Sequence, residues 1–404
     1  MVTQQVSETI TERPRLLVPF AFGHFANDLA PVAMFLIIPA FGVAMGLSPI
    51  EIGLLFTIHS LGAALAYLPA GVVTDHVANR GILLLATFFW VGLGYFGASF
   101  ASDYWTFALM ITIAGAGDAA WHPMATGVLA SIEKERRAYA FGVHAVGGHL
   151  AEVIGLVLTG YLLSLGDWSF ALQVVAVPAA LMGFAFIFVA PRVPLAKAAR
   201  PRKADFIDVW NTWATRSGLG IVSLFACYNL ALFALMTMTP VFLQSVHKFD
   251  WQETSIALAL MMVLGVLAQP IMGRVSDTMG RRTLLVLGNA VAAVAACVAW
   301  ISPSLTGILI ALAVAMTVLV AIRAVILAAA VDYAGNREGV SLGMAFAFMD
   351  GVGALGAVLA GYIGQSDLSL AFLLASAFSA IAGGLAVIVL APSHAAREQE
   401  ASDG

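Results

Sequence analysis

The sequence Gly-Arg-Val-Ser-Asp-Thr-Met-Gly-Arg-Arg, residues 273–282, joins two long apolar runs and has a shorter relative in Gly-Val-Val-Thr-Asp, residues 71–75. Other residues recur at the same offset of 202 or 201 positions, among them Asn27 and Asn229, Glu51 and Glu253, Arg80 and Arg282, Gly155 and Gly356, Gly160 and Gly361, and Tyr161 and Tyr362. A nearly constant offset along both parts of the chain predicts two related halves. In a membrane protein, parallel repeats place the substrate site between the halves, near the midplane.

The composition indicates a membrane protein. Hydrophobic residues make up 61% of the 404 residues and charged residues 10%, against about 45–50% and about 25% in soluble domains. So few charges cannot cover a soluble surface, whereas lipid can cover an apolar one. Runs of roughly 20 apolar residues span a bilayer as helices, which satisfy their own backbone groups. We predict an all-α membrane protein with twelve spans at residues 16–45, 49–75, 81–101, 104–132, 138–165, 167–190, 217–246, 250–277, 281–302, 304–333, 338–365 and 367–391.

Positive charge predicts the orientation. All but two of the 19 lysines and arginines fall on one side of these spans, the exceptions being Lys248 and Arg323. Loops rich in lysine and arginine face the cytoplasm, so both termini are predicted to be cytoplasmic, in a bacterial inner membrane. The first run is too long for a signal-peptide core and is expected to be retained.

The predicted organisation has five parts: an N-terminal tail (1–15), a six-helix bundle (16–190), a basic cytoplasmic linker (191–216), a second six-helix bundle (217–391) and a C-terminal tail (392–404). Within the linker, helical spacing of apolar residues predicts a short helix that anchors the chain to the membrane surface. A partner-binding role is the alternative. The residues are Phe206, Val209, Trp210 and Trp213.

The loop at residues 273–282 has an interpretable chemistry. Its first glycine permits close approach of helices, Asp277 suits the positive end of a helix dipole, and its arginines can pair with carboxylates. This ordered pattern resembles the hallmark loop of the Major Facilitator Superfamily, and the resemblance extends over residues 16–391. It implies two six-helix bundles related by a pseudo-twofold axis, and a gating loop that latches the outward-open state. The candidate gating residues are Gly71, Asp75, Arg80, Gly273, Asp277, Gly280, Arg281 and Arg282.

A narrower resemblance lies in three motifs that are similar to those of the fosmidomycin-resistance branch of drug exporters. They are His24-Phe-Ala-Asn27-Asp28, Gly115-Ala-Gly117-Asp118-Ala-Ala-Trp121-His122-Pro123 and Val146-Gly147-Gly148. The chain departs from the branch at His149, where asparagine is expected, and at Asp118, where a small residue is expected. The resemblance implies export of a small molecule, and the departures bear on which molecule.

Four carboxylates fall near the centres of predicted spans: Asp28, Asp118, Glu152 and Asp350. An isolated ionised carboxylate in lipid is very unfavourable, so each must be paired, hydrated or protonated. Ionisable groups inside membranes usually mark a transport pathway. These four are therefore the candidates for proton coupling, and a static buried pair that holds helices together is the alternative.

Other polar residues within spans are candidates for the substrate cavity, which the family resemblance places between the first, fourth, seventh and tenth spans. Arg323 is expected either to neutralise an internal acid or to bind an anionic substrate. His122 has a structural alternative, because the adjacent Pro123 frees carbonyls that it can bond. His59 and Asp350, at similar depth, are predicted to pair between the halves. The cavity candidates are His24, Asn27, His122, His149, Asn229 and Arg323.

These features favour a secondary active transporter that works by alternating access: a proton-coupled antiporter that exports a drug-like or metabolic small molecule. A proton-coupled symporter that imports a small organic anion is the alternative. An enzyme or a non-transporting sensor is disfavoured, because the sequence contains no G-x-x-x-x-G-K, no H-E-x-x-H and no soluble catalytic domain. The expected partners are the substrate, protons and lipid, without ATP, nucleic acid, metal or cofactor, and we expect a monomer.

Overall fold

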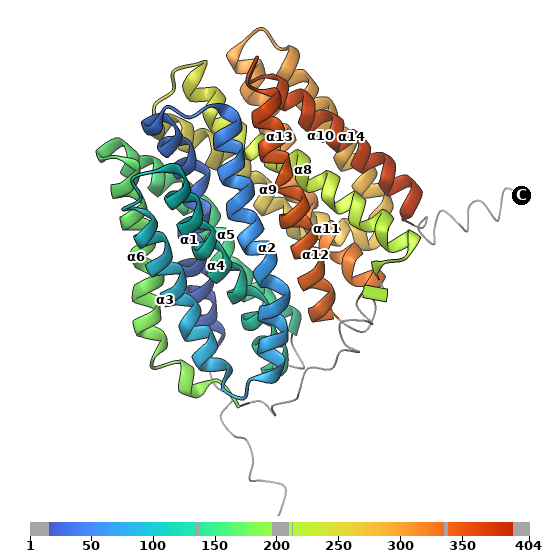
Figure 1. Ribbon diagram of the computed structural model, residues 1–404. Helices are drawn as coiled ribbons and strands as arrows, with labels where there is room; N and C mark the ends of the chain where they lie inside the picture. The colour runs from blue at the N-terminus through green and yellow to red at the C-terminus, as the bar shows by residue number, and fades with distance from the viewer. Residues whose placement is uncertain (1–15, 134–136, 196–209, 212, 335–337, 391–404) are drawn as a thin grey trace, which may run out of the picture.

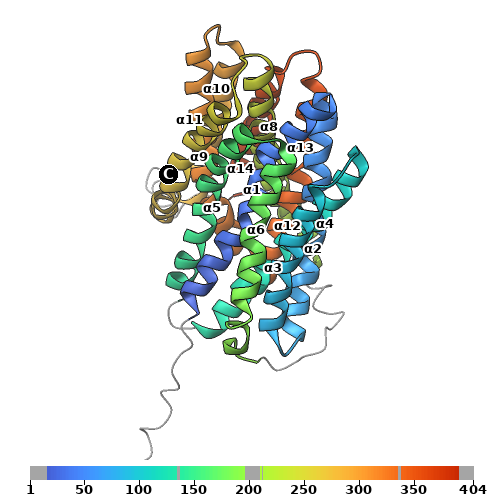
Figure 2. The same cartoon turned by 90° about the vertical axis from the view of Figure 1, so that its left-hand side faces the viewer.

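The structure is a computed structural model that describes residues 16–133, 137–195, 210–211, 213–334 and 338–390. Figure 1 shows a bundle of long helices, and Figure 2 shows it from the side. The N-terminal half contains α1 (Leu17–Met45), α2 (Pro49–His76), α3 (Arg80–Ala98), α4 (Tyr104–Ile132), α5 (Arg137–Leu165), α6 (Trp168–Phe186) and the short 3-10 helix η1 (Ala190–Arg192). The C-terminal half contains α8 (Arg216–Ser245), α9 (Trp251–Met279), α10 (Arg281–Ile301), α11 (Leu305–Ala334), α12 (Glu338–Gly353), α13 (Leu355–Ile363) and α14 (Leu370–Val389). Both predicted tails and most of the predicted linker helix lie outside the described residues.

The predicted fold of twelve helical spans is confirmed, with α12 and α13 joined through Ala354 to form the eleventh span. In the described part of the chain, eleven spans are long and apolar enough to cross a membrane. The remaining one, α4, is 29 residues long but less apolar, because Asp118, His122 and Pro123 stand in its middle. The span that falls short in hydropathy is thus one that carries predicted site residues.

Equivalent helices of the two halves start in the same way. The Glu51 carboxylate, in the first turn of α2, accepts hydrogen bonds from the backbone N–H and the hydroxyl of Ser48. The Glu253 carboxylate, in the first turn of α9, accepts from the Asp250 N–H, and the Glu253 N–H donates to the Asp250 carboxylate. Such capping boxes satisfy N–H groups that a helix start leaves free. Glu51 and Glu253 therefore recur because α2 and α9 begin with the same capping interaction.

The halves meet along two sets of helices. In Figure 1, α2 lies beside α12 and α13, and in Figure 2, α5 lies beside α9; both pairings are closely packed. Span two thus packs on span eleven, and span five on span eight. This packing leaves α1, α4, α8 and α11 free to contribute polar side chains to the region between the halves.

Repeated glycines stand at these contacts between the halves. A Cβ on Gly160 of α5 would lie 2.8 Å from the carbonyl oxygen of Trp251, the first residue of α9. A Cβ on Gly361 of α13 would lie 2.9 Å from the carbonyl carbon of Pro49, the first residue of α2. Only glycine allows such close approach of two backbones. Because α2 and α9 both start at this end of the bundle, the halves are packed together there.

Candidate functional site

The centre of the N-terminal half holds a set of polar side chains that we call the α1–α4 cluster: His24, Asn27 and Asp28 from α1, and Asp118 and His122 from α4. His24 and Asp28, like Asp118 and His122, are four residues apart and share a helix face. Their side chains are 13–23% exposed, whereas Asn27 is fully buried. The structure thus brings together five of the predicted site residues, four of them within reach of solvent or a ligand.

Asn27 connects the two carboxylates of the α1–α4 cluster. Its amide nitrogen Nδ2 donates to Asp28 Oδ1 at 3.2 Å and also to Asp118 Oδ1. One amide group therefore holds a carboxylate from each helix. No lysine or arginine pairs with either carboxylate among the described ion pairs, which instead involve the histidines.

Two imidazoles flank the same carboxylates. His24 Nε2 lies 3.1 Å from Asp28 Oδ2. His122 Nε2 lies 3.8 Å from Asp28 Oδ1 and 3.8 Å from Asp118 Oδ1. His122 therefore faces the acids of the cluster, which favours the predicted role in the cavity over the alternative of a histidine that only bonds carbonyls freed by Pro123.

His24 is oriented from behind by α5. Its Nδ1 donates to the backbone carbonyl of His144 at 2.8 Å, and the two rings stack with centroids 4.1 Å apart. A Cβ on Gly148 would lie 2.7 Å from the His24 ring, so glycine is what permits α5 to approach. His144 was not among the predicted site residues, because a bond to a backbone carbonyl leaves no pattern in the sequence.

An aromatic layer packs beside the α1–α4 cluster and fixes the four helices that contribute to it. The ring of Trp121, fully buried, lies 4.6 Å from that of Phe88 and 5.8 Å from that of Phe20, with Phe186 also in contact. Buried aromatic side chains dominate the energetics of such cores. The polar cluster is therefore mounted on a rigid apolar support formed by α1, α3, α4 and α6.

A second polar group crosses between the halves. Arg323 Nη1 of α11 lies 3.6 Å from Glu152 Oε1 of α5, and Glu152 Oε2 lies 3.2 Å from His149 Nδ1. The side chains of Arg323 and His149 are 36% and 34% exposed. Of the two roles left open for Arg323, the structure shows an internal acid as its neighbour, and this acid is Glu152 of the opposite half.

The predicted pair of His59 and Asp350 is not formed, because each residue has another partner. His59 Nε2 lies 2.6 Å from the Tyr95 hydroxyl, whereas Asp350 accepts a hydrogen bond of 2.7 Å from the Tyr67 hydroxyl. Tyr67 is eight residues beyond His59 in α2, which corresponds to about 12 Å along a helix. The prediction correctly linked α2 with α12 but placed the contact two turns too early.

Asn229, a predicted cavity residue, ties α8 to the eleventh span. It is buried, and its Nδ2 donates to the Met349 carbonyl at 2.6 Å. Thr57 of α2 donates to the Ala354 carbonyl at 2.8 Å, which also accepts from the Ala357 N–H at 3.0 Å. These side chains therefore add bonds from α8 and α2 to a span whose backbone stays hydrogen-bonded through Ala354.

The predicted gating loop makes its described contacts within its own half. Arg281 donates to Asp277, to Ser276 and, at 3.1 Å, to Asp332 of α11. Gly280 has a φ of 87°, which favours glycine. In the N-terminal copy, Arg80 Nε donates to the Thr74 carbonyl at 2.9 Å, and the side chain of Asp75 lies outside the described residues. The predicted loop is mostly helical: Gly71 lies near the C-terminal end of α2, Gly273 near that of α9, and Arg282 in the first turn of α10, so only Gly280 stands between α9 and α10.

Three side chains are placed so that they can hold one metal ion. The ligand atoms of His24, Asp28 and His122 all lie within 4.8 Å of one another. These residues come from two helices far apart in the chain, so no ligand spacing in the sequence indicates the set, and the sequence predicts no metal.

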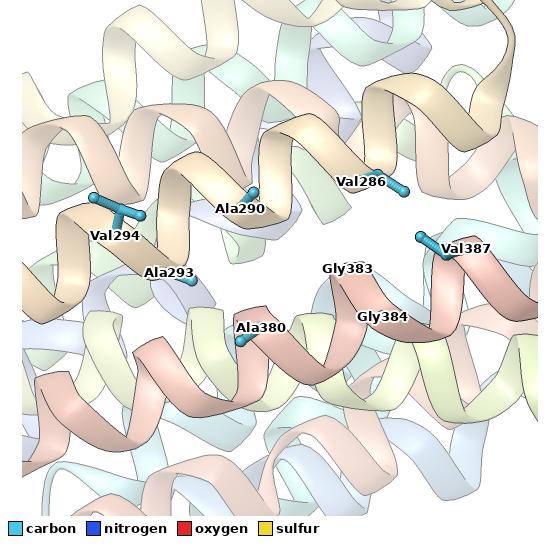
Figure 3. A pocket seen from close by; sticks show the side chains of 8 residues that line it. All are labelled: Val286, Ala290, Ala293, Val294, Ala380, Gly383, Gly384 and Val387. Carbon is cyan, nitrogen blue, oxygen red and sulfur yellow. The ribbon is translucent and has the colours of Figure 1, made fainter.

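The C-terminal half carries a separate apolar groove between α10 and α14, shown in Figure 3. None of the predicted site residues lines it. Its lining consists of Val286, Ala290, Ala293, Val294, Ala380, Gly383, Gly384 and Val387.

Comparison with known sequences gives one family and several relatives. A sequence model described as the Major Facilitator Superfamily matches residues 20–268 and 249–404. The chain is 27% identical over 267 residues to a probable nitrate/nitrite antiporter, NarK1, of Thermus thermophilus, covering 59% of this chain and 56% of that protein. It is 25% identical over 183 residues to a probable sugar efflux transporter of Haemophilus influenzae, covering 45% of each. The chain thus spans about half the length of the curated relatives it matches.

Solved structures match over nearly the whole chain. A bacterial homologue of the human lysosomal transporter Spinster, in an inward-facing and occupied conformation, aligns with a TM-score of 0.77 at 15% identity, covering 93% of this chain and 96% of that one. The nucleoside transporter NupG aligns with a TM-score of 0.75 at 14% identity, covering 93% and 99%. At such identities the likeness shows the fold alone.

Proposed function

The chain belongs to the Major Facilitator Superfamily, and from this premise we propose that it is a proton-coupled antiporter that exports a small molecule across a bacterial inner membrane. The family makes the protein a membrane transporter rather than an enzyme. In our proposal the substrate binds between the halves, which expose it alternately to either side, and the α1–α4 cluster carries the proton. The protein acts as a monomer with both termini in the cytoplasm, and the proton gradient drives it without ATP.

The observation that carries the proposal is the sharing of one amide and one imidazole by Asp28 and Asp118. Asn27 Nδ2 donates to both carboxylates, and His122 Nε2 lies 3.8 Å from both. Two ionised carboxylates held this closely in a region of low dielectric repel each other, and no guanidinium or ammonium of the described residues pairs with either of them. Retaining a proton removes that cost, and releasing it restores the charge.

The central charges of the molecule support the same reading. Four carboxylates stand near the centres of spans, and the one guanidinium among the described central residues, Arg323, lies beside Glu152. The other three are neighboured by histidines, an amide or the Tyr67 hydroxyl. Protons are the obvious source of the missing positive charge.

Two polar contacts would link proton movement to alternating access. The Arg323–Glu152 contact and the Tyr67–Asp350 hydrogen bond both join the N-terminal to the C-terminal half. When the halves separate at this level, both must break, and the freed groups then depend on water, substrate or protons. Such contacts give the two conformations different affinities for protons and substrate, as coupling requires.

Two lines of evidence favour export. The relatives include a probable antiporter and a probable efflux transporter. The motifs around His24, Asp118 and Gly147 resemble those of the fosmidomycin-resistance branch of exporters. A drug-like or metabolic compound is the substrate class we propose on these grounds.

Uptake of a small organic anion with protons is the second candidate, and it rests on Arg323. Its side chain is 36% exposed, and the separation of 3.6 Å between its Nη1 and Glu152 Oε1 is longer than a hydrogen bond. A carboxylate or phosphate of a substrate could take the place of Glu152 in a bidentate contact. Substitution Arg323→Lys should then weaken binding sharply, because a fork becomes a point charge.

The decisive experiment is transport in liposomes with an imposed pH gradient, screening anionic and cationic compounds for proton-linked flux. We expect flux against the direction of proton entry, and Asp118→Asn should abolish gradient-driven transport while sparing substrate exchange. Asp367→Asn, a matched change at an exposed turn before α14, should leave proton coupling intact. If no transported compound moves protons, the proposal is wrong; flux in the direction of proton entry selects the symporter.

A further inference from the structure

His24 and Asp28 face each other with atoms that both carry lone pairs. His24 Nδ1 donates to the His144 carbonyl, which can only accept. A neutral His24 therefore presents an unprotonated Nε2, and this atom lies 3.1 Å from Asp28 Oδ2, another acceptor. Two acceptors at this distance need a positive species between them, which is either a proton or a metal cation.

A third ligand stands on the other side of the same carboxylate. His122 Nε2 lies 3.8 Å from Asp28 Oδ1, and the three ligand atoms of His24, Asp28 and His122 fall within 4.8 Å of one another. Zinc binds imidazole nitrogen and carboxylate oxygen at roughly 2.0–2.2 Å, so tetrahedral ligand atoms lie about 3.3 Å apart. The 3.1 Å contact to Asp28 Oδ2 already fits. His122 Nε2 lies 3.8 Å from the other oxygen, Asp28 Oδ1, and ligand atoms separated by as much as 4.8 Å must close by up to about 1.5 Å.

The surroundings of these ligands are those that metal sites use. Metal-bound histidines usually donate their second nitrogen to a carbonyl or carboxylate, which fixes the ring and its tautomer. His24 does so through the His144 carbonyl, and the stacked His144 ring restrains it further. Asn27 donates to Asp28 Oδ1 and so orients the carboxylate. Asp118 Oδ1, 3.8 Å from His122 Nε2, or a water can occupy the fourth position.

We propose that His24, Asp28 and His122 form a binding site for a divalent transition-metal ion of the zinc, cobalt or nickel class. Two imidazoles and one carboxylate suit these ions, whereas calcium and magnesium prefer oxygen alone. The side chains are 13–23% exposed, so the ion has a route to them. The site lies within the N-terminal half and shares His24, Asp28 and His122 with the α1–α4 cluster, so a bound ion and a proton compete for the same lone pairs.

The test is a titration of the full-length protein, purified without a histidine tag and freed of metal with a chelator. We expect one Co²⁺ per chain with visible absorption bands of a low-coordinate site, and displacement of that Co²⁺ by one equivalent of Zn²⁺. X-ray absorption of the bound zinc should count two imidazole ligands. Absence of saturable binding by the unmodified protein, or zinc bound without imidazole, would overturn the proposal.

Variants locate the ion. His24→Asn keeps an amide donor for the His144 carbonyl but removes Nε2, and Asp28→Asn keeps the shape of the side chain but removes its charge. Each should weaken Zn²⁺ binding by at least about tenfold. The control is His247→Gln, because His247 packs on Phe242, away from the α1–α4 cluster. This variant should bind Zn²⁺ as tightly as the unmodified protein does.

Each result has a definite meaning once gel filtration and thermal unfolding show that the variants are folded. Undiminished binding in Asp28→Asn or His24→Asn contradicts the assignment, as does an equal loss in His247→Gln. Should either variant not fold, the count of imidazoles in the unmodified protein decides. If the protein binds no metal, the proposed proton coupling is not contradicted. If the transport assay shows no proton coupling, the proposed metal site is not contradicted.

Discussion

Arg323 of α11 lies 3.6 Å from Glu152 of α5, so the guanidinium at the centre of one half faces a carboxylate of the other. At the repeat offset, Arg323 corresponds to His122, which faces the carboxylates of the α1–α4 cluster within its own half. The two halves thus place a basic group at equivalent positions but direct it to different acids. His122 therefore belongs to a cluster within one half, whereas the Arg323–Glu152 contact must break when the halves move apart.

Removal of either member of the Arg323–Glu152 contact should destabilise the protein more than removal of both. Arg323→Gln leaves Glu152 without its cation, and Glu152→Gln leaves Arg323 without its anion, whereas the double variant leaves neither charge. We expect a coupling of roughly 0.5–3 kcal/mol, toward the lower end because the Arg323 side chain is partly exposed. Unfolding in detergent, measured for all four proteins, gives this value, and strict additivity would contradict the contact.

The glycine contacts between the halves should set the balance between conformations. Gly160→Ala puts a Cβ 2.8 Å from the Trp251 carbonyl oxygen, and Gly361→Ala puts one 2.9 Å from the Pro49 carbonyl carbon. Both changes should force the halves apart at the end where α2 and α9 start. Distances between spin labels across that end are expected to lengthen in both variants.

The matched controls for these changes are Gly97→Ala and Gly142→Ala, because a Cβ at either position meets nothing within 4 Å. Their label distances should equal those of the unmodified protein. An unchanged distribution in Gly160→Ala and Gly361→Ala would show that these glycines do not limit the approach of the halves.

The repeat in the sequence predicts whatever the two halves have in common. Glu51 and Glu253 cap equivalent helices, and Gly160 and Gly361 occupy equivalent contacts. Such features recur because both halves need the same helix caps and the same close contacts between helices. The repeat, together with the apolar runs, was sufficient to predict twelve spans in two bundles.

What the sequence could not predict depends on how far each helix is shifted and rotated against its neighbours. His59 and Asp350 have similar depth by counting residues, yet Tyr67 is the residue of α2 that reaches Asp350. The bond from His24 to a backbone carbonyl of α5 has no sequence pattern at all. The clustering of His24, Asp28 and His122 likewise requires the packing of α1 against α4, which periodicity alone does not define.

Because His59 and Asp350 have separate partners, their substitutions should act independently. His59→Ala breaks the contact with Tyr95, and Asp350→Ala breaks the bond from Tyr67. Effects on stability of non-contacting sites add within about 0.3–0.5 kcal/mol. By contrast, Tyr67→Phe combined with Asp350→Asn should be non-additive. Thermal unfolding of both double-mutant cycles tests the assignment, and a coupling confined to the His59–Asp350 cycle would reverse it.

Exchange of acid and amide between positions 27 and 118 tests the link between α1 and α4. Asn27→Asp alone places a third carboxylate beside Asp28 and Asp118 and removes the donor that they share. A hydrogen bond to a charged group contributes about 1.5–3 kcal/mol, and the added carboxylate also repels its neighbours, so this variant should unfold at a markedly lower temperature. Adding Asp118→Asn restores an amide opposite a carboxylate and should recover most of the lost stability.

The control is Asn289, an equally buried asparagine whose described bond lies within α10. Asn289→Asp should lower the unfolding temperature, and adding Asp118→Asn should not raise it again. Rescue of fold without rescue of proton-driven transport would then separate the structural role of the amide–acid contact from a role of Asp118 in carrying the proton.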